Sequence, residues 1–201
     1  MMKRILLAIV CLLTLCSVNA QDATKVLDKT ATTLRAAGNV KIGFTLEANG
    51  ASTVGYIKLQ NQKFVLNVRG TITWFDGKTM WTYVKANEEV NVTTPSADAV
   101  AKMNPYAFLS FYKKGYTAKM GKGTAKEHEV ILTGKSGSPY KRVVVCINKS
   151  TKYPTSITMT TSKDVTTKIL CNSFLKDQKY KEATFRFNEK NYPDVEVIDL
   201  R

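Results

Sequence analysis

Short segments in which apolar and polar residues alternate fill most of the chain from Val40 onward, and turn residues separate them. A period of two is that of β-strands whose two faces meet different surroundings. Because turns such as Asn49-Gly50 and Asp76-Gly77 are short, neighbouring strands are expected to pair antiparallel. The pattern predicts strands at 40–46, 56–59, 64–68, 90–92, 116–120, 129–133, 140–148, 156–161, 165–172 and 184–187, a hairpin at 71–83, and a last extended stretch at 192–201.

Helical spacing occurs before the strands and once among them. Residues 22–38 place apolar side chains on one side and end at Gly38, a common helix stop. Two short helices are expected in the insert at 95–114, and their apolar face would consist of Val100, Met103, Phe108, Leu109, Phe111 and Tyr112. We therefore expect a mainly β (α+β) fold: a single curved antiparallel sheet of about eleven strands, covered by about three short helices.

Residues 1–20 have the form of a secretory signal, with a basic start, an apolar run and small residues before Gln21. The run is shorter than the roughly 20 apolar residues that a membrane-spanning helix needs. Lipidation of Cys11 or Cys16 is less favoured, because Val10 and Leu15 stand where that processing prefers a small residue. We expect cleavage to leave one soluble exported domain, residues 21–201, that acts as a monomer.

The chain has 30 basic and 16 acidic residues, a formal net charge of +14. Such a charge would suit nucleic acid, an anionic membrane or an acidic protein. The export signal argues against nucleic acid, and the lysines are scattered, without the clustered basic helix or stacking platform of nucleic-acid-binding proteins. We expect no nucleic-acid partner. The charge is assigned first to solvated surface and second to attraction toward anionic membranes or lipoprotein partners.

Few residues could support catalysis or metal binding. His128 is the only histidine, and Glu127 and Glu129 flank it on a predicted strand, as is typical of a surface residue. Neither a Gly-x-Ser-x-Gly motif nor a Cys with a suitable His and Asn set occurs, although paired carboxylates remain an alternative. Cys146 and Cys171 are interpreted as small buried residues rather than a disulfide, because an intervening strand would hold their Cα atoms about 10 Å apart. We expect no enzyme activity, no cofactor and no metal.

The hairpin TITWFDGKTMWTY, residues 71–83, holds both tryptophans. Its Gly-Lys-Thr lacks the earlier glycine that a phosphate-binding loop needs, since Ile72 stands there. Asp76-Gly77 instead suits a two-residue type I′ turn, which would pair Trp74 with Thr79. Period two then places Ile72, Trp74, Trp81 and Tyr83 on one face. Such a face is usually core, but about three short helices would fill a large curved sheet incompletely, so an apolar cavity is predicted.

The residues from Gly55 to Tyr83, with Lys63-Phe64 and "DGKTMW" at 76–81, resemble the LolA family of periplasmic lipoprotein carriers. The stretch "MNPYAFLSFYKKGY" falls where that family has its lid helices, and "FRFNEKNYPDVEVIDLR" resembles its terminal strand. The resemblance spans nearly the whole mature chain. It implies an unclosed β-barrel whose helical lid covers an apolar cavity.

The resemblance also implies a function and a site. The protein would be a periplasmic chaperone that takes acylated lipoproteins from an inner-membrane ABC-type lipoprotein-releasing complex to the outer membrane, where an acceptor is possible. The cavity would be lined by Phe64, Leu66, Ile72, Trp74, Trp81 and Tyr83, and the lid would be the insert with the six apolar residues named above. Many members have an arginine that holds the lid; this chain has Gln60, which could reach the lid without charge.

Two other classes of function stay open. The same fold could serve as a lipid- or lipoprotein-sensing regulatory module or as an outer-membrane lipoprotein receptor, although a sensing module would be expected to carry a second domain. A lipid-acting hydrolase is less favoured, because no inward-facing Ser and His pair is visible in the pattern.

Overall fold

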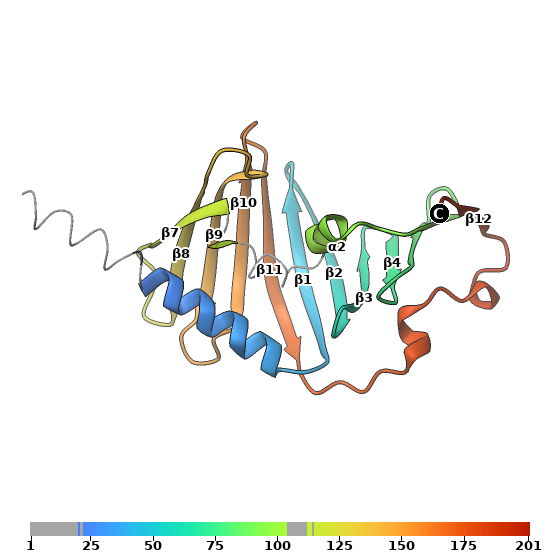
Figure 1. The fold of residues 1–201 in the computed structure, drawn as a ribbon, viewed down its shortest axis with the longest axis horizontal. Coiled ribbons are helices and arrows are strands. Elements are labelled where there is room, and N and C mark those ends of the chain that lie inside the picture. The colour runs from blue at the N-terminus through green and yellow to red at the C-terminus, as the bar shows by residue number, and fades with distance from the viewer. Residues whose placement is uncertain (1–19, 21, 104–111, 114) are drawn as a thin grey trace, which may run out of the picture. The chain divides into compact units, whose positions relative to one another are not determined.

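The computed structural model describes residues 20, 22–103, 112–113 and 115–201. Within them, twelve strands hydrogen-bond in the order β12-β6-β5-β4-β3-β2-β1-β11-β10-β9-β8-β7 (Figure 1). The fold is mostly β with a single, largely antiparallel sheet, as the alternation predicts. The predicted count of about eleven strands is wrong, because twelve are described; the last of them lies within the extended stretch predicted at 192–201. The chain divides into two compact units, residues 1–33 with 109–167 and residues 34–108 with 168–201.

The unit of residues 1–33 and 109–167 contains an antiparallel meander of β7 (Tyr116–Met120), β8 (Glu127–Gly134), β9 (Tyr140–Asn148) and β10 (Pro154–Thr161). Its apolar residues alternate as expected: Leu132 pairs with Val143 and Val130 with Val145, and all four are fully buried. One face of this meander is therefore core.

The unit of residues 34–108 and 168–201 contains β1 (Val40–Ala48), β2 (Ala51–Gln60), β3 (Lys63–Val68), β4 (Thr71–Phe75), β5 (Met80–Val84) and β6 (Glu89–Thr93), each paired antiparallel with the next. Asn49 and Gly50, at φ of 52° and 73°, form the β1–β2 turn, for which positive φ at both positions is needed. Strand β11 (Thr166–Leu175) begins at the border of the units.

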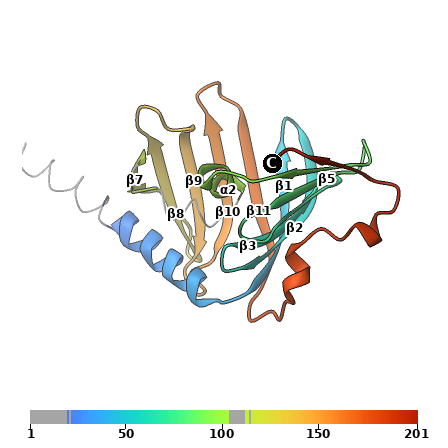
Figure 2. The same ribbon diagram turned by 45° about the vertical axis from the view of Figure 1, so that its right-hand side comes forward.

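The C-terminal residues differ from the prediction. The strand expected at 184–187 is wrong, because Glu182–Phe185 forms the 3₁₀ helix η1, and Glu189–Asn191 forms a second, η2. The last extended stretch does contain a strand, β12 (Glu196–Asp199), which pairs parallel to β6. The chain reaches this parallel position because residues 176–195, called the C-terminal strap below, run alongside the β3–β5 region before β12 begins (Figure 2).

The helix predicted near the N-terminus is confirmed over residues 22–36. It buries Leu27, Ala31 and Leu34 along one side, and Gly38 follows it at a φ of 66°. In the insert, α2 (Ala97–Met103) begins where Ser96 Oγ accepts a hydrogen bond from the Ala99 amide at 3.2 Å. The second helix expected in the insert lies outside the described residues, so the count of about three short helices is not reproduced.

Among the helices of the described residues, none combines the length and the apolar character needed to cross a membrane.

Candidate functional site

The tryptophan hairpin pairs its strands in a register two residues away from the predicted one. Trp74 lies directly opposite Trp81, and Ile72 opposite Tyr83, so the predicted pairing of Trp74 with Thr79 is wrong. The connection is the longer loop of residues 76–79 rather than a two-residue turn. Because the difference is one full period of the strand, the four residues Ile72, Trp74, Trp81 and Tyr83 still share one face.

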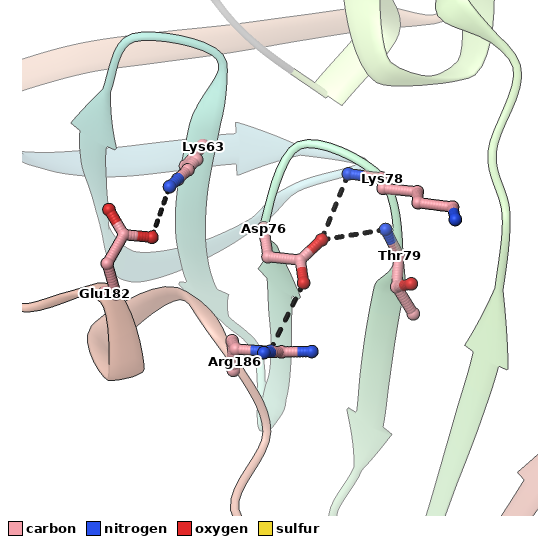
Figure 3. Close-up of polar contacts among 6 residues, drawn as sticks. All are labelled: Lys63, Asp76, Lys78, Thr79, Glu182 and Arg186. Carbon is pink, nitrogen blue, oxygen red and sulfur yellow. Dashed lines mark hydrogen bonds and ion pairs between the residues drawn. The ribbon is translucent and has the colours of Figure 1, made fainter.

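Asp76 shapes this loop through its side chain. Its Oδ1 accepts hydrogen bonds from the amides of Lys78 and Thr79, at 3.0 and 2.9 Å (Figure 3). The amide of Asp76 donates to the carbonyl oxygen of Thr79 at 3.2 Å. A carboxylate that accepts hydrogen bonds from two backbone amides replaces the backbone hydrogen bonds between the strands that a tighter turn would make. The loop is therefore a hydrogen-bonded turn, with no sign of a phosphate-binding role.

The strands of this unit present two apolar faces, and the predicted cavity residues are divided between them. Val65 pairs with Trp74 and Trp74 with Trp81, so these residues define one side, called the Trp face. Phe64 pairs with Phe75, on the opposite side, called the Phe face. The Trp face carries Ile72, Trp74, Trp81 and Tyr83, whereas the Phe face carries Phe64 and Leu66. The expectation that all six line one cavity is wrong, because successive residues of a strand point to opposite sides.

The Trp face is covered by the C-terminal strap. Phe185 is fully buried against Val65 and Trp74, and Tyr180, Phe187 and Tyr192 pack around them. The rings of Phe187 and Tyr192 lie with their centroids 5.6 and 5.8 Å from that of Trp74, and Tyr192 lies 4.9 Å from Tyr83. Burial raises the pKa of Tyr192, with Tyr83 as a further cause. The Trp face is thus occupied by this chain's own aromatic residues.

Polar contacts fix the strap at its two ends and in its middle. The backbone amide of Gln178 donates to the Asn39 carbonyl at 2.9 Å, and the Tyr180 hydroxyl donates to the Val40 carbonyl at 3.1 Å. In the middle, Glu182 pairs with Lys63 on β3 (Figure 3). Beyond η2, the strap leads into β12, whose pairing with β6 holds the far end.

Arg186 joins the strap to the tryptophan hairpin. Its Nε lies 3.3 Å from Oδ2 of Asp76 (Figure 3). Its guanidinium carbon lies 5.7 Å from the centre of the Trp81 ring. Arginine suits this position because one planar group can meet a carboxylate and an aromatic face together. Asp76 therefore both stabilises its own loop and forms an ion pair with the strap.

The Phe face is apolar across neighbouring strands. Its buried residues are Val40, Ile42, Phe44, Ile57, Leu59, Phe64, Phe75 and Met80, and Leu66 is half-buried. The rings of Phe64 and Phe75 lie 5.4 Å apart. Gly55 makes room for Phe44, since a Cβ at Gly55 would lie 2.7 Å from that ring. These residues form a continuous apolar surface over five strands.

The insert is described only in part. Phe108, Leu109 and Phe111 lie outside the described residues; Val100 is half-buried and Met103 is exposed. At the end of the insert, Tyr112 is buried and its hydroxyl donates to Asp28 Oδ1 at 2.8 Å, while Lys113 pairs with the same oxygen at 2.8 Å. Burial and the nearby Asp28 both raise the pKa of Tyr112 well above its usual range.

Gln60, expected to contact the lid, ends β2. Its side-chain oxygen Oε1 is buried and has no hydrogen-bond partner among the described residues. A buried amide oxygen without a partner is costly.

The described residues give little support for metal binding, for a catalytic histidine or for a reactive cysteine. Within the described residues no group of three or more His, Cys, Asp and Glu side chains could hold a metal ion. His128 is half-buried, and its pKa is lowered by burial and by Lys149 and Lys152. Cys146 and Cys171 are free thiols, and burial raises the pKa of Cys171 to about 11.

The residues that sequence reasoning missed are the aromatic residues of the strap: Tyr180, Phe185, Phe187 and Tyr192. The pattern predicts a strand at 184–187, which contains Phe185 and Phe187, and an extended stretch that begins at Tyr192; Tyr180 lies in no predicted element. The sequence does contain a signal that places Phe64 and Trp74 on opposite faces. Arg69-Gly70 forms a two-residue turn in which both φ values are positive, and such a turn places Val65 opposite Trp74.

Solved structures with a similar fold have very different sequences. An uncharacterized conserved protein from Thermus thermophilus is 12% identical with a TM-score of 0.61, covering 89% of this chain and 99% of that one. A DUF1329 family protein from Desulfovibrio piger is 13% identical with a TM-score of 0.50, covering 84% and 97%. A LolA superfamily protein from Nitrosomonas europaea is 10% identical with a TM-score of 0.44, covering 82% and 97%, a likeness too weak to support a conclusion by itself.

No match was found among curated proteins. The model of a protein family, described as outer membrane lipoprotein carrier protein LolA, matches residues 13–163. This stretch is well over half of the 201 residues and contains β1 to β10. The chain therefore belongs to the family of the outer membrane lipoprotein carrier protein LolA.

Proposed function

We propose that the protein is a periplasmic carrier that binds the acyl chains of lipoproteins and moves them from the inner to the outer membrane, without acting as an enzyme. Its partners would be acylated lipoproteins, an inner-membrane ABC-type releasing complex and an outer-membrane acceptor. Family membership supports the carrier class. The observation that carries the site assignment is the continuous apolar Phe face, because acyl chains need an extended surface of this kind.

The acyl site is proposed on the Phe face rather than the Trp face. The Trp face already has an occupant, the C-terminal strap, whose Phe185 is fully buried there. The family match ends at residue 163, so it includes the strands of the Phe face and the insert but not the strap. Phe64 and Leu66 are the proposed acyl contacts. Ile72, Trp74, Trp81 and Tyr83 are proposed to hold the strap instead.

A carrier must release what it binds. Burying an acyl chain gains about 0.8 kcal/mol per CH₂, so a sixteen-carbon chain gains about 12 kcal/mol. Three fully buried chains would exceed the practical limit of about 18 to 21 kcal/mol for non-covalent affinity. A lid that competes with lipid for the Phe face would reduce the net gain. We propose this role for the 95–114 insert, with Gln60 as a contact.

Binding of a triacylated peptide labelled with a fluorophore tests the proposal. Leu66→Glu places a charge on the Phe face and is expected to weaken binding at least about tenfold, because the carboxylate would meet the chains unpaired. Ile72→Glu is the matched control, since Ile72 is also half-buried, on the neighbouring strand and on the opposite face. It should bind within about twofold of the parent.

Circular dichroism must show that both variants are folded. If Ile72→Glu alone loses binding, the acyl site lies on the Trp face. If the parent itself does not bind the peptide, the carrier proposal is wrong. Native mass spectrometry of the protein purified from its own cells would then show which molecules it carries.

A further inference from the structure

Two lysine-containing loops of the unit formed by residues 1–33 and 109–167 lie side by side. They are the β7–β8 loop, residues 121–126, and the β9–β10 loop, residues 149–153, together called the basic loop pair; Figure 1 shows them at the same end of their strands. The Lys149 amide donates to the Lys126 carbonyl at 2.9 Å, and Lys149 Nζ donates to the Thr124 carbonyl at 2.7 Å. The loops are therefore held as one surface.

The loop pair concentrates positive charge. Lys122 and Lys126 are exposed, and Lys149 and Lys152 are half-buried. Within the described residues none of these four makes an ion pair, whereas Lys141, near the other end of the meander, is paired with Asp164. The Nζ atoms of Lys149 and Lys152 donate to the carbonyls of Thr124 and Lys149, which carry no net charge. The four positive charges therefore stay unneutralised and can attract an external anion.

The nearest carboxylates are engaged in local hydrogen bonds. Glu127 accepts from the Thr155 hydroxyl at 2.6 Å, and Glu129 accepts from the Lys122 amide at 3.2 Å. They offset part of the charge but leave the four lysines in excess. The lowered pKa of His128, caused by burial and then by Lys149 and Lys152, is consistent with a positive potential at this end.

We propose that the basic loop pair binds the anionic surface of a phospholipid membrane. Lysines near a membrane surface attract anionic headgroups without requiring a fixed geometry, and each strengthens binding by about fivefold. A protein partner fits less well, because protein interfaces are depleted in lysine and enriched in arginine and aromatic residues. The loop pair has no arginine, and Tyr153 is its one aromatic residue.

The test measures partitioning onto vesicles of phosphatidylcholine, alone or mixed with phosphatidylglycerol. The mature chain is expected to bind the anionic vesicles and not the neutral ones, and salt should weaken the binding. Changing Lys122, Lys126, Lys149 and Lys152 together to Gln should reduce partitioning at least about tenfold. The assay contains no acylated cargo, so this inference goes beyond the carrier proposal and can fail independently of it.

A control variant separates the position of the charge from its amount. Lys135, Lys141, Arg142 and Lys163 lie on or near the loops at the opposite end of the same meander, and changing them to Gln removes the same formal charge. Circular dichroism checks the folding of both variants. Retained partitioning in the control supports the proposal. An equal loss in both variants would overturn it, as would equal binding to neutral vesicles. If the parent chain does not bind anionic vesicles, the proposal is also overturned, and an acidic protein partner is favoured.

Discussion

Trp74 and Trp81 face each other directly across the β4–β5 hairpin, yet their indoles meet different groups of the C-terminal strap. Trp74 lies against the rings of Phe187 and Tyr192, and Trp81 lies under the guanidinium of Arg186. One indole is therefore held by aromatic packing and the other by a cation. Because the strap supplies both contacts, it is part of the folded core of its unit.

Phe185 is predicted to be the main anchor of the strap. Its side chain is fully buried, and its ring lies 5.5 Å from that of Tyr180. Phe185→Ala should lower the free energy of unfolding by about 3 to 5 kcal/mol, the usual cost of a buried Phe to Ala change. Denaturant unfolding followed by tryptophan fluorescence measures it. Thr184→Ala, at the half-buried neighbouring position, should cost much less; equal losses would argue against an anchoring role for Phe185.

Asp76 is predicted to act through two separable interactions. Asp76→Ala removes the acceptor for the amides of Lys78 and Thr79 and the partner of Arg186, and should cost about 1 to 2 kcal/mol of stability. Asp76→Asn keeps a side-chain oxygen for the amides and loses only the charge that faces Arg186. Since that arginine is exposed, the loss should be smaller, below about 1 kcal/mol. Thermal unfolding of both variants provides the comparison, and a larger loss for Asn than for Ala would contradict it.

The faces of the tryptophan hairpin could be predicted from sequence although its register could not. Asp76-Gly77 has the composition of a tight turn, but the Asp76 carboxylate accepts the amides of Lys78 and Thr79 and stabilises a longer loop. Local side-chain bonding of this kind competes with turn geometry and is not visible in a pattern of apolar residues. The error was two residues, so the face assignment of Trp74 and Trp81 was unaffected.

For the C-terminal strap, the sequence pattern predicts which side chains are buried together but not the secondary structure. Phe185 and Phe187 are two residues apart and do share a surface, as alternation predicts, but that surface is the side of a sheet and the segment is not a strand. Periodicity reports which side chains are buried together; it does not report which backbone pairs. The edge position beside β6 is taken by β12, so the strap's aromatic residues pack on a face instead.

Cys171 is predicted to react slowly with alkylating reagents at neutral pH. Burial raises its pKa from 9.0 to about 11, so the reactive thiolate becomes abundant only as the pH approaches about 11. At pH 8 the thiolate fraction should be about one hundredfold below that of an unperturbed thiol, since each pKa unit is tenfold. In a protein of residues 21–201 that carries Cys146→Ser, iodoacetamide labelling followed by mass spectrometry gives the rate against pH. A rate that levels off near pH 9 would show that Cys171 is not perturbed.

Tyr112 is predicted to fix the end of the 95–114 insert to the N-terminal helix. Its buried hydroxyl donates to Asp28 Oδ1 at 2.8 Å, and Asp28 also pairs with the half-exposed Lys113. Tyr112→Phe keeps the ring and removes the hydroxyl, so it should cost about 1 kcal/mol of stability, because Asp28 retains Lys113 as a partner. Lys113→Gln removes only a surface ion pair and should cost less than about 0.5 kcal/mol. Hydrogen exchange should show faster opening at residues 112–113 in Tyr112→Phe than in Lys113→Gln, since the exchange rate reports local opening. Unchanged exchange in Tyr112→Phe, with the strands as an internal reference, would mean that ring burial alone holds this end of the insert.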